Sequence, residues 1–307
     1  MPYTAIYSYL QTHLEEMLAF LGGLVRAESP STDPAAQTAV QAPLTAALED
    51  LAYTVQHVPG RRSGGHLLAT PAAADPAAPR QLLLAHTDTV WPLGTLAAMP
   101  LARDGRSLRG PGVFDMKGSL AMLVFVLRAL RHLELTPAVT PVLLLNSDEE
   151  IGSHESRPAI EQQARQACRA LVLEPAFGPD GRLKTARKGV GRFAVTITGQ
   201  AAHAGIEPEK GASAILELAA VIQQLHALND LPRGVSVNVG LVSGGVLTNV
   251  VAPHARADVD LRAPTQADAA RLDAAVRALR PTTPGTTLAV SGGFERPPLE
   301  RTPANQA

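Results

Sequence analysis

The sequence predicts two domains of different class, an α/β domain followed by an α+β domain. Its 307 residues exceed the length of one average domain, so two domains are the natural expectation. In the first part, short continuous apolar runs alternate with helical patterns, as the buried strands of a parallel sheet do. The three runs cover residues 81–85, 141–145 and 170–173. From about Lys184 onward, apolar and polar residues alternate, which is typical of half-exposed strands.

The first part is expected to begin with two helices. An apolar stripe indicates a helix over residues 7–26. Asp33 followed by Pro34 is a favoured N-cap and first helical residue, so a second helix is expected from there to about residue 51. The other elements expected in this part are short strands at 53–58 and 66–69, an Ala/Pro loop at 70–80 and an apolar helix at 118–133.

The second part follows the order strand, helix, strand, strand, helix, strand. Alternating patterns predict the strands and amphipathic patterns predict the helices. The expected strands cover residues 190–198, 235–242, 255–261 and 287–290, and the expected helices cover residues 212–228 and 266–279. This order indicates an α+β sandwich that is separate from the first domain.

Charge favours a small-molecule substrate over a macromolecular partner. The formal net charge is −1, and acidic and basic residues are mixed along the chain. The sequence has no basic stripe of the kind that binds nucleic acid or an anionic membrane. Residues 17–25 are apolar, but a membrane helix needs roughly 20 such residues. We therefore expect neither nucleic acid nor membrane as a partner.

The cysteine count indicates a reducing compartment. Cys168 is the only cysteine, so no disulfide can form within the chain. Residues 163–169 are polar and are expected to be helical, which favours an inert structural thiol over a nucleophile. The N-terminus lacks the basic region and small-residue cleavage site of a secretory signal. A cytoplasmic location is expected.

Five residues that can bind metal ions stand at strand ends or in loops. They are His86, Asp115, Glu149, Glu150 and Glu174. Each would carry little weight alone, but the carboxyl ends of parallel strands meet at one edge of a sheet, so together they indicate one site.

Two zinc ions about 3.5–4 Å apart need a bridging carboxylate, imidazole or carboxylate ligands and an open position for water. Asp88, two residues past His86, could accept the far ring N–H and fix the tautomer. A spare glutamate beside the ligands could take a proton from the attacking water and return it to the leaving amine.

Ordered motifs carry a resemblance to a known family. They are residues 84–95 (LAHTDTVWPLGT), 109–118 (RGPGVFDMKG), 147–152 (SDEEIG), 173–175 (LEP) and 199–205 (GQAAHAG). The chain resembles the co-catalytic zinc peptidases, which include glutamate carboxypeptidase, aminoacylase and acetylornithine deacylase. The resemblance implies a zinc-peptidase-like catalytic domain with a mostly parallel central sheet and an inserted α+β dimerisation domain.

The resemblance also implies a role for each site residue. Asp115 would bridge two Zn²⁺ ions, His86 and Glu174 would complete one site, and Glu150 would bind the other ion. Glu149 would be the general base, and the Asp115–Met116 peptide would be cis. Co²⁺ or Mn²⁺ could occupy the same ligands.

The implied domains are residues 1–183, the catalytic domain, and residues 184–293, the dimerisation domain. Residues 294–307 would begin the return to the catalytic domain. The resemblance implies a homodimer in which His203 reaches the partner's substrate carbonyl. Asn249 resembles a substrate-contacting asparagine. Arg262 and Arg296 could bind a substrate carboxylate bidentately, or form surface ion pairs.

The pattern departs from the family at the C-terminus. The family supplies a final histidine ligand after the dimerisation domain, but residues 294–307 contain no histidine. Asp115 and Glu150 are then the two protein ligands expected for the second metal. Two hypotheses remain open. One is a hydrolase that cleaves an amide or peptide bond in a peptide or N-acyl amino acid. The other is an inactive dimerising binding protein or truncated remnant.

Overall fold

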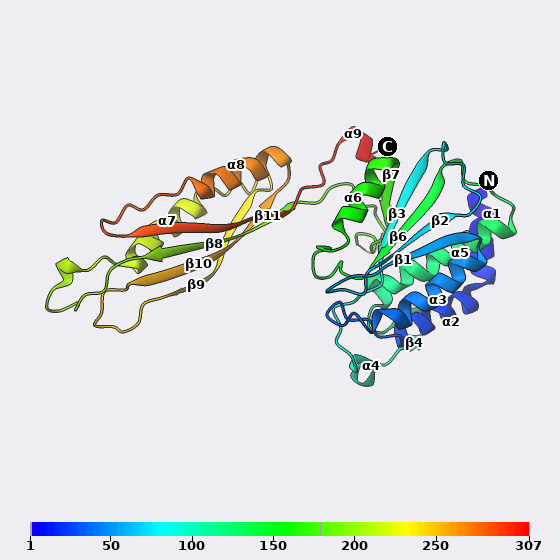
Figure 1. Ribbon diagram of the computed structural model, residues 1–307, viewed down its shortest axis with the longest axis horizontal. Helices are drawn as coiled ribbons and strands as arrows, with labels where there is room; N and C mark the ends of the chain where they lie inside the picture. Colours follow the sequence, from blue (N-terminus) through cyan, green and yellow to red (C-terminus); the bar gives the residue numbers. More distant parts are fainter. Residues whose placement is uncertain (1, 179, 307) are drawn as a thin grey trace. The chain divides into compact units, whose positions relative to one another are not determined.

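The computed structural model describes residues 2–178 and 180–306 and shows two compact units (Figure 1). The units are Met1–Pro175 and Ala176–Ala307. The boundary between them follows Pro175, eight residues before the end of the catalytic domain expected from the sequence. Residues 294–307 group with the second unit. Arg187 and Leu299 form an isolated β-bridge there, which joins the two ends of that unit's chain.

The first unit contains a five-stranded sheet in the order β1-β2-β6-β3-β7. β3 pairs in parallel with β6 and with β7, and β2 is antiparallel to both β1 and β6. Four of the five strands therefore run the same way, which confirms the mostly parallel sheet. The strands are β1 (Tyr53–Val58), β2 (His66–Pro71), β3 (Arg80–His86), β6 (Thr140–Asn146) and β7 (Ala167–Val172).

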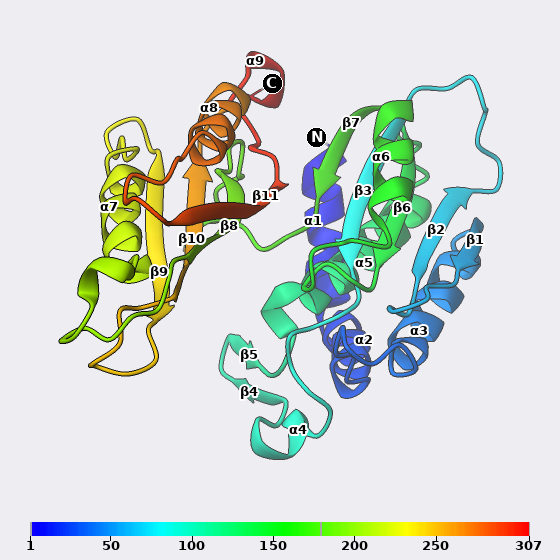
Figure 2. The same ribbon diagram turned by 60° about the vertical axis from the view of Figure 1, so that its left-hand side comes forward.

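Helices cover both faces of this sheet (Figure 2). One face carries α1 (Pro2–Thr12), α2 (Leu14–Arg26), α3 (Gln37–Asp50) and α5 (Gly118–His132). α6 (Arg157–Gln166) packs against β3 and β7. Between β3 and α5 the chain forms a short helix and hairpin and then the turn that precedes α5. These are α4 (Thr95–Ala98), β4 (Ala102–Asp104), β5 (Ser107–Arg109) and the turn η1 (Val113–Lys117).

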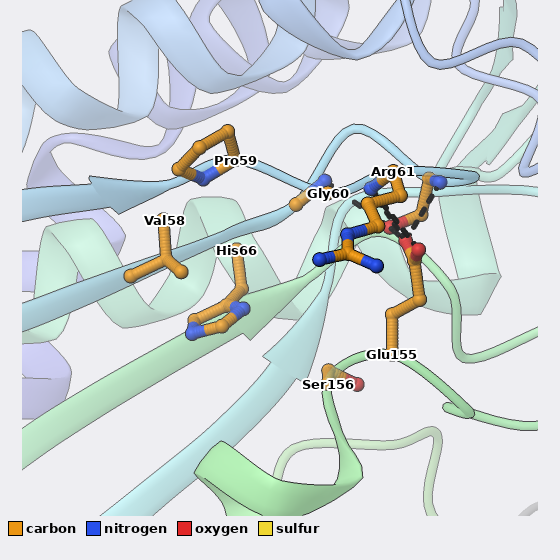
Figure 3. A pocket seen from close by; sticks show the side chains of 9 residues that line it. Val58, Pro59, Gly60, Arg61, His66, Glu155 and Ser156 are labelled. Carbon is orange, nitrogen blue, oxygen red and sulfur yellow. Dashed lines mark hydrogen bonds between the residues drawn. The ribbon is translucent and has the colours of Figure 1, made fainter.

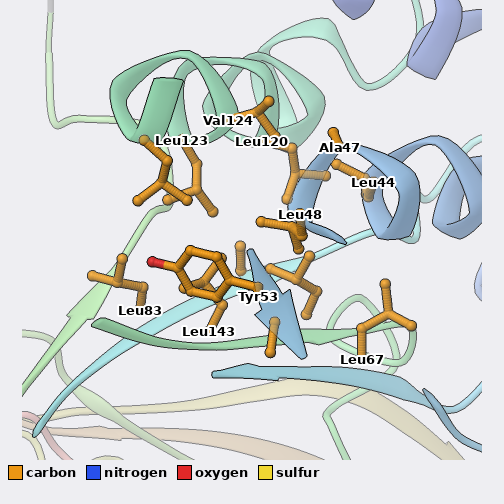
Figure 4. Packing of buried hydrophobic residues seen from close by; sticks show 14 of the residues in the cluster. Leu44, Ala47, Leu48, Tyr53, Leu67, Leu83, Leu120, Leu123, Val124 and Leu143 are labelled. Atoms are coloured by element: carbon orange, nitrogen blue, oxygen red, sulfur yellow. The ribbon is translucent and has the colours of Figure 1, made fainter. Parts of the chain in front are cut away.

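The core of the first unit lies between α3, α5 and the sheet (Figure 4). Leu120 and Val124 project from α5 toward Leu48 of α3, and Leu143 of β6 lies beneath them. All four side chains are almost completely buried. Burying a side chain of this size contributes about 1.5–3 kcal/mol. This packing holds β3 and β6 in place and so fixes where their carboxyl ends lie.

The start of the chain differs from the expected pair of helices. The helix expected at residues 7–26 is two helices, because His13 between them has a non-helical backbone with φ of −101° and ψ of 21°. The His13 ring Nδ1 lies 2.9 Å from the Tyr9 carbonyl oxygen. Asp33 does accept the N–H groups of Ala35 and Ala36. These residues form a turn, however, and α3 begins only at Gln37, three residues past Pro34.

The third strand expected in the first part is present as β7, but its burial was predicted wrongly. α6 ends at Gln166, so Cys168 lies in β7 and is exposed, where a helix was expected. β7 is at the edge of the sheet and pairs only with β3 among the described residues. Leu171 and Val172 are therefore 47% and 58% exposed. An apolar run does not distinguish an interior strand from an edge strand.

The second unit is a four-stranded antiparallel sheet with two long helices. The strands lie in the order β11-β8-β10-β9, and α7 and α8 pack on one face over Phe193, Val195 and Ile197. Its elements are β8 (Gly189–Thr198), η2 (Pro208–Lys210), α7 (Ala214–His226), β9 (Ser236–Gly244), β10 (His254–Ala263), α8 (Gln266–Arg277), β11 (Thr287–Arg296) and α9 (Pro303–Gln306).

This unit confirms the expected order of strands and helices. Ser213 and Thr265 cap α7 and α8 by accepting the N–H groups of Leu216 and Asp268. β11 is six residues longer than the strand expected at 287–290, because its pairing with β8 continues to Arg296 through a bulge.

Candidate metal centre

His86 occupies the end of β3, with its ring almost completely buried at 2% exposure. Its Nδ1 lies 2.9 Å from the carbonyl oxygen of Asp88. A carbonyl oxygen can only accept, so Nδ1 carries a hydrogen, and once the ring is neutral Nε2 is left with its lone pair. Nε2 lies 3.1 Å from Oδ1 of Asp115 and 3.5 Å from Oε1 of Glu174. A metal ion that displaces the Nε2 proton would therefore bind His86 through this atom.

Asp88 orients the histidine mainly through its backbone. The Asp88 Oδ1 atom lies 3.4 Å from Nδ1 of His86, farther than the carbonyl oxygen. The carboxylate itself accepts the hydroxyl of Ser31 at 2.6 Å and the N–H groups of Glu149 and Glu150 at 3.3 and 3.2 Å. Asp88 therefore connects the histidine to the backbone that carries the two glutamates.

Four carboxylates gather around His86. Glu149 and Glu150 follow β6, Glu174 follows β7, and Asp115 lies in the turn Val113–Lys117. Two overlapping groups can each offer ligand atoms within 4.8 Å of one another, namely His86 with Glu149 and Glu174, and His86 with Asp115 and Glu150. The expected convergence of strand ends is thus present in the structure.

The turn that presents Asp115 is irregular. The Asp115–Met116 peptide is cis, as the resemblance implied. Gly112 begins the turn with φ of +66°, where a β-carbon would lie 2.7 Å from Cγ2 of Thr89. The Met116 side chain is buried, and its Sδ accepts the N–H of His86 at 3.2 Å. The turn is thereby attached to the end of β3.

Charges at the site fit a divalent cation. Burial and the neighbouring Asp115 carboxylate raise the pKa of Glu150 to about 7. Burial lowers the pKa of His86, but hydrogen bonds to Asp115, Asp88 and Glu174 outweigh it and raise this pKa to about 12. Without a metal, then, protons compensate the crowded negative charge. One imidazole and several carboxylates form a donor set that zinc and similar ions accept.

Sequence reasoning did not single out Ser31, Lys117 or Asp148. Ser31 lies 57 positions from Asp88 and carried no signal. Lys117 is buried and donates from Nζ to the Ala27 carbonyl oxygen at 2.8 Å. Burial lowers its pKa to about 8. Asp148 stands directly before Glu149, a position that could have marked it.

The other four residues of interest lie in the second unit. His203 and Asn249 are neighbours, because Ala204 N–H donates to the Asn249 carbonyl oxygen and His203 forms a β-bridge with Val250. Both side chains are exposed.

Arg262 of β10 and Arg296 of β11 both pair with Val190 of β8, one from each side. Arg262 also forms a bidentate ion pair with Asp260, in which Nε and Nη2 donate to the two carboxylate oxygens at 2.7 and 2.9 Å. Arg262 and Arg296 thus belong to the second unit, and the cluster around His86 belongs to the first.

Similar proteins of known family indicate the family of this chain. Residues 185–286 match the model of the peptidase dimerisation domain. The chain is 32% identical to carboxypeptidase G2 of Pseudomonas sp. over 198 residues, which are 64% of this chain and 47% of that protein. It is 35% identical to a probable carboxypeptidase of Aspergillus terreus over 237 residues, 72% of this chain and 53% of that one. The chain belongs to the M20 peptidase family.

The fold agrees with this assignment. Aminopeptidase PepT of Bacillus cereus superimposes with a TM-score of 0.77 at 22% identity, over 93% of this chain and 77% of that one. The present M20 chain spans about half the length of the curated relatives it matches. Within residues 2–178 and 180–306, no helix is both long and apolar enough to cross a membrane.

Proposed function

We propose that the chain hydrolyses an amide or peptide bond with bound divalent metal ions and releases a C-terminal amino acid or the amino acid of an N-acyl substrate. The observation that supports this proposal most is the group of His86 and four carboxylates, which lie after the ends of β6 and β7 and in the turn before α5. Several of these carboxylates remain half-buried or exposed, so a small substrate has access to them.

The residues proposed to hold the ions are His86, Asp115, Glu150 and Glu174. Asp115 is the proposed bridge, because it shares the Nε2 side of His86 with Glu174 and belongs to a second group with Glu150. Zn²⁺ is our first choice because an imidazole is among the ligands, and Co²⁺ or Mn²⁺ are alternatives. When bound, such ions polarise a carbonyl oxygen and acidify water.

Glu149 is the proposed general base. Its carboxylate is close to His86 and Glu174, and its N–H is held by Asp88. It would take a proton from the attacking water and return the proton to the departing amine. Asp88 would orient His86 and the Glu149–Glu150 backbone.

The proposed substrate class is a peptide or an N-acyl amino acid with a free carboxylate. The relatives are named as carboxypeptidases, which supports a substrate whose C-terminal carboxylate is recognised. Arg262 and Arg296 are proposed carboxylate ligands, since a guanidinium binds a carboxylate through two N–H groups. His203 and Asn249 are proposed to contact the scissile carbonyl and the substrate.

A homodimer through the second unit is part of the proposal. β9 lies at the edge of its sheet and pairs only with β10 among the described residues. Its Leu241 and Val242 are 69% and 58% exposed, and Ile215 and Leu216 on the adjacent α7 are exposed too. An unpaired apolar edge of this kind suits pairing with a second copy about a two-fold axis. A cytoplasmic location stays a prediction from the single cysteine.

Metal-dependent cleavage of matched substrates tests the proposal. The purified chain would be stripped with a chelator, reloaded with Zn²⁺ and given peptides and N-acyl amino acids, each with its C-terminal amide as control. We expect the metal-loaded chain to hydrolyse the compounds that have a free carboxylate. The metal-free chain should not hydrolyse them, and the C-terminal amides should not be hydrolysed. A metal-loaded chain that binds these compounds but cleaves none would favour the inactive binding protein.

A further inference from the structure

The side chain of Glu155 is bound by the loop between β1 and β2, residues 59–65 (Figure 3). Its carboxylate accepts the N–H groups of Arg61, Arg62 and Ser63, at distances of 2.9–3.2 Å. It also accepts the Ser63 hydroxyl at 2.7 Å. Three successive N–H groups that converge on one carboxylate form a backbone nest for an anion.

The close fit of this contact requires a glycine. A β-carbon at Gly60 would lie 2.8 Å from Oε2 of Glu155 and 2.6 Å from Oγ of Ser63. The hydrogen bond from the Ser63 hydroxyl and those from the loop N–H groups lower the pKa of Glu155. The side chain is therefore ionised at neutral pH, which strengthens hydrogen bonds from the nest.

Glu155 itself belongs to residues 147–156, the segment between β6 and α6. This segment is here called the glutamate loop. This loop carries Glu149 and Glu150. Buried Asp148 closes it, because its carboxylate accepts the N–H groups of Glu155 and Ser156 at 2.8 and 3.1 Å and the Ser156 hydroxyl at 2.6 Å.

The glutamate loop is therefore attached to its surroundings at several places. At the end of β6, the Asn146 side chain donates to Asp148 at 3.1 Å and to the Ser156 hydroxyl at 2.9 Å. Asp88 holds the N–H groups of Glu149 and Glu150, and the Ser147 hydroxyl donates to the Gly65 carbonyl oxygen at 2.7 Å. Glu155 attaches the far end of the loop to residues 61–63. Ser147 and Glu155 bind the same β1–β2 loop, so they hold the glutamate loop from both ends.

We infer that Glu155 is a positioning residue that keeps Glu149 and Glu150 in place by anchoring the glutamate loop to residues 61–63. The effect of Glu155 on metal affinity rests on the proposed function. The hydrogen-bond partners of Glu155 among residues 2–178 and 180–306 are Arg61, Arg62, Ser63 and Asp148, so it acts on the metal ligands through the backbone of the loop.

Two measurements test the anchor, both on Glu155→Ala and Glu155→Gln. Glu161→Gln is the matched control, since Glu161 is an exposed glutamate on α6 whose partner is Arg165 at the surface. Hydrogen exchange on the metal-free chain reports the order of residues 147–156 and 59–65. Titration with Co²⁺ reports the affinity and, through the visible spectrum, the geometry of the metal ligands.

For Glu155→Ala we expect faster exchange confined to these two segments and a Co²⁺ affinity lower by about 10-fold, the lower end of the effect of residues that orient metal ligands. Glu155→Gln retains one accepting oxygen, so it should fold and show a smaller change of the same kind. Glu161→Gln should match the wild-type chain in both measurements.

A lower melting temperature with unchanged local exchange and unchanged Co²⁺ affinity would overturn the inference, because that is the effect of a merely structural residue. If the wild-type chain itself binds no Co²⁺, the proposed function fails. Hydrogen exchange then still decides the inference, since unchanged exchange in Glu155→Gln refutes the anchor and faster local exchange supports it.

Discussion

Nε2 of His86 lies 3.1 Å from Oδ1 of Asp115, although 29 positions separate the two residues in the sequence. Met116 explains the approach, because its side chain is buried and its Sδ accepts the N–H of His86. The residue after Asp115 is thus attached to the residue that Asp115 faces. We therefore expect His86 and Asp115 to bind the same metal ion.

Glu149→Gln should remove catalysis and leave the metal in place. An amide cannot take up a proton, and general acid–base groups contribute about 10²–10⁴-fold to rate, so turnover should fall by that factor. Metal content should stay equal to that of the wild-type chain, because Glu149 is the proposed base and not a ligand. Turnover and metal content measured on the same preparation check this. A variant that retains substantial turnover would refute the role of Glu149.

Asp88→Asn should weaken metal binding. The carboxylate accepts hydrogen bonds on both oxygens, from Ser31 and from the Glu149 and Glu150 N–H groups, and an amide can accept on only one atom. Loss of such support costs about 10–100-fold in metal affinity, which Co²⁺ titration measures. Asp33→Asn is the control, because Asp33 caps an exposed turn. Equal affinity in the two variants would contradict the prediction.

The metal-free chain should lose stability as pH rises from 4.5 to 7. The pKa of Glu150 is raised from 4.5 to about 7 in the folded chain, mainly by burial and by Asp115. The folded state therefore binds more protons than the unfolded state in this range, and its stability is present below pH 4.5 and is lost as pH rises through 7. Thermal unfolding at several pH values checks this. Glu150→Gln should flatten the profile, and an identical slope in both chains would show that Glu150 is not responsible.

The parallel core and the ligand-bearing strand ends could be predicted because local patterns carry them. The run at β3 is buried and is followed directly by His86 and Asp88, and β6 is followed by Glu149. The exposure of β7 could not be predicted, since it depends on which strand lies beside it. The same holds for Ser31 and for Glu155, whose partners are distant in sequence and are set by the fold.

Leu241→Glu should shift the chain toward the monomer. The substitution places a charge on the exposed edge of β9, where the proposed dimer pairs its strands. Molar mass by light scattering during size-exclusion chromatography reports the change. Leu183→Glu, at an exposed leucine before β8, should leave the mass unaltered. A Leu241→Glu chain that remains dimeric would exclude this edge as the interface.

The metal content of the purified chain tests the central claim most directly. Elemental mass spectrometry after exhaustive dialysis would compare the wild-type chain with His86→Ala, since both ligand groups include His86. Our account predicts that the wild-type chain retains zinc and that His86→Ala loses zinc, with a wild-type value near two per chain if two ions share the proposed ligands. Wild-type zinc no higher than that of His86→Ala would contradict the assignment of this cluster as a metal centre.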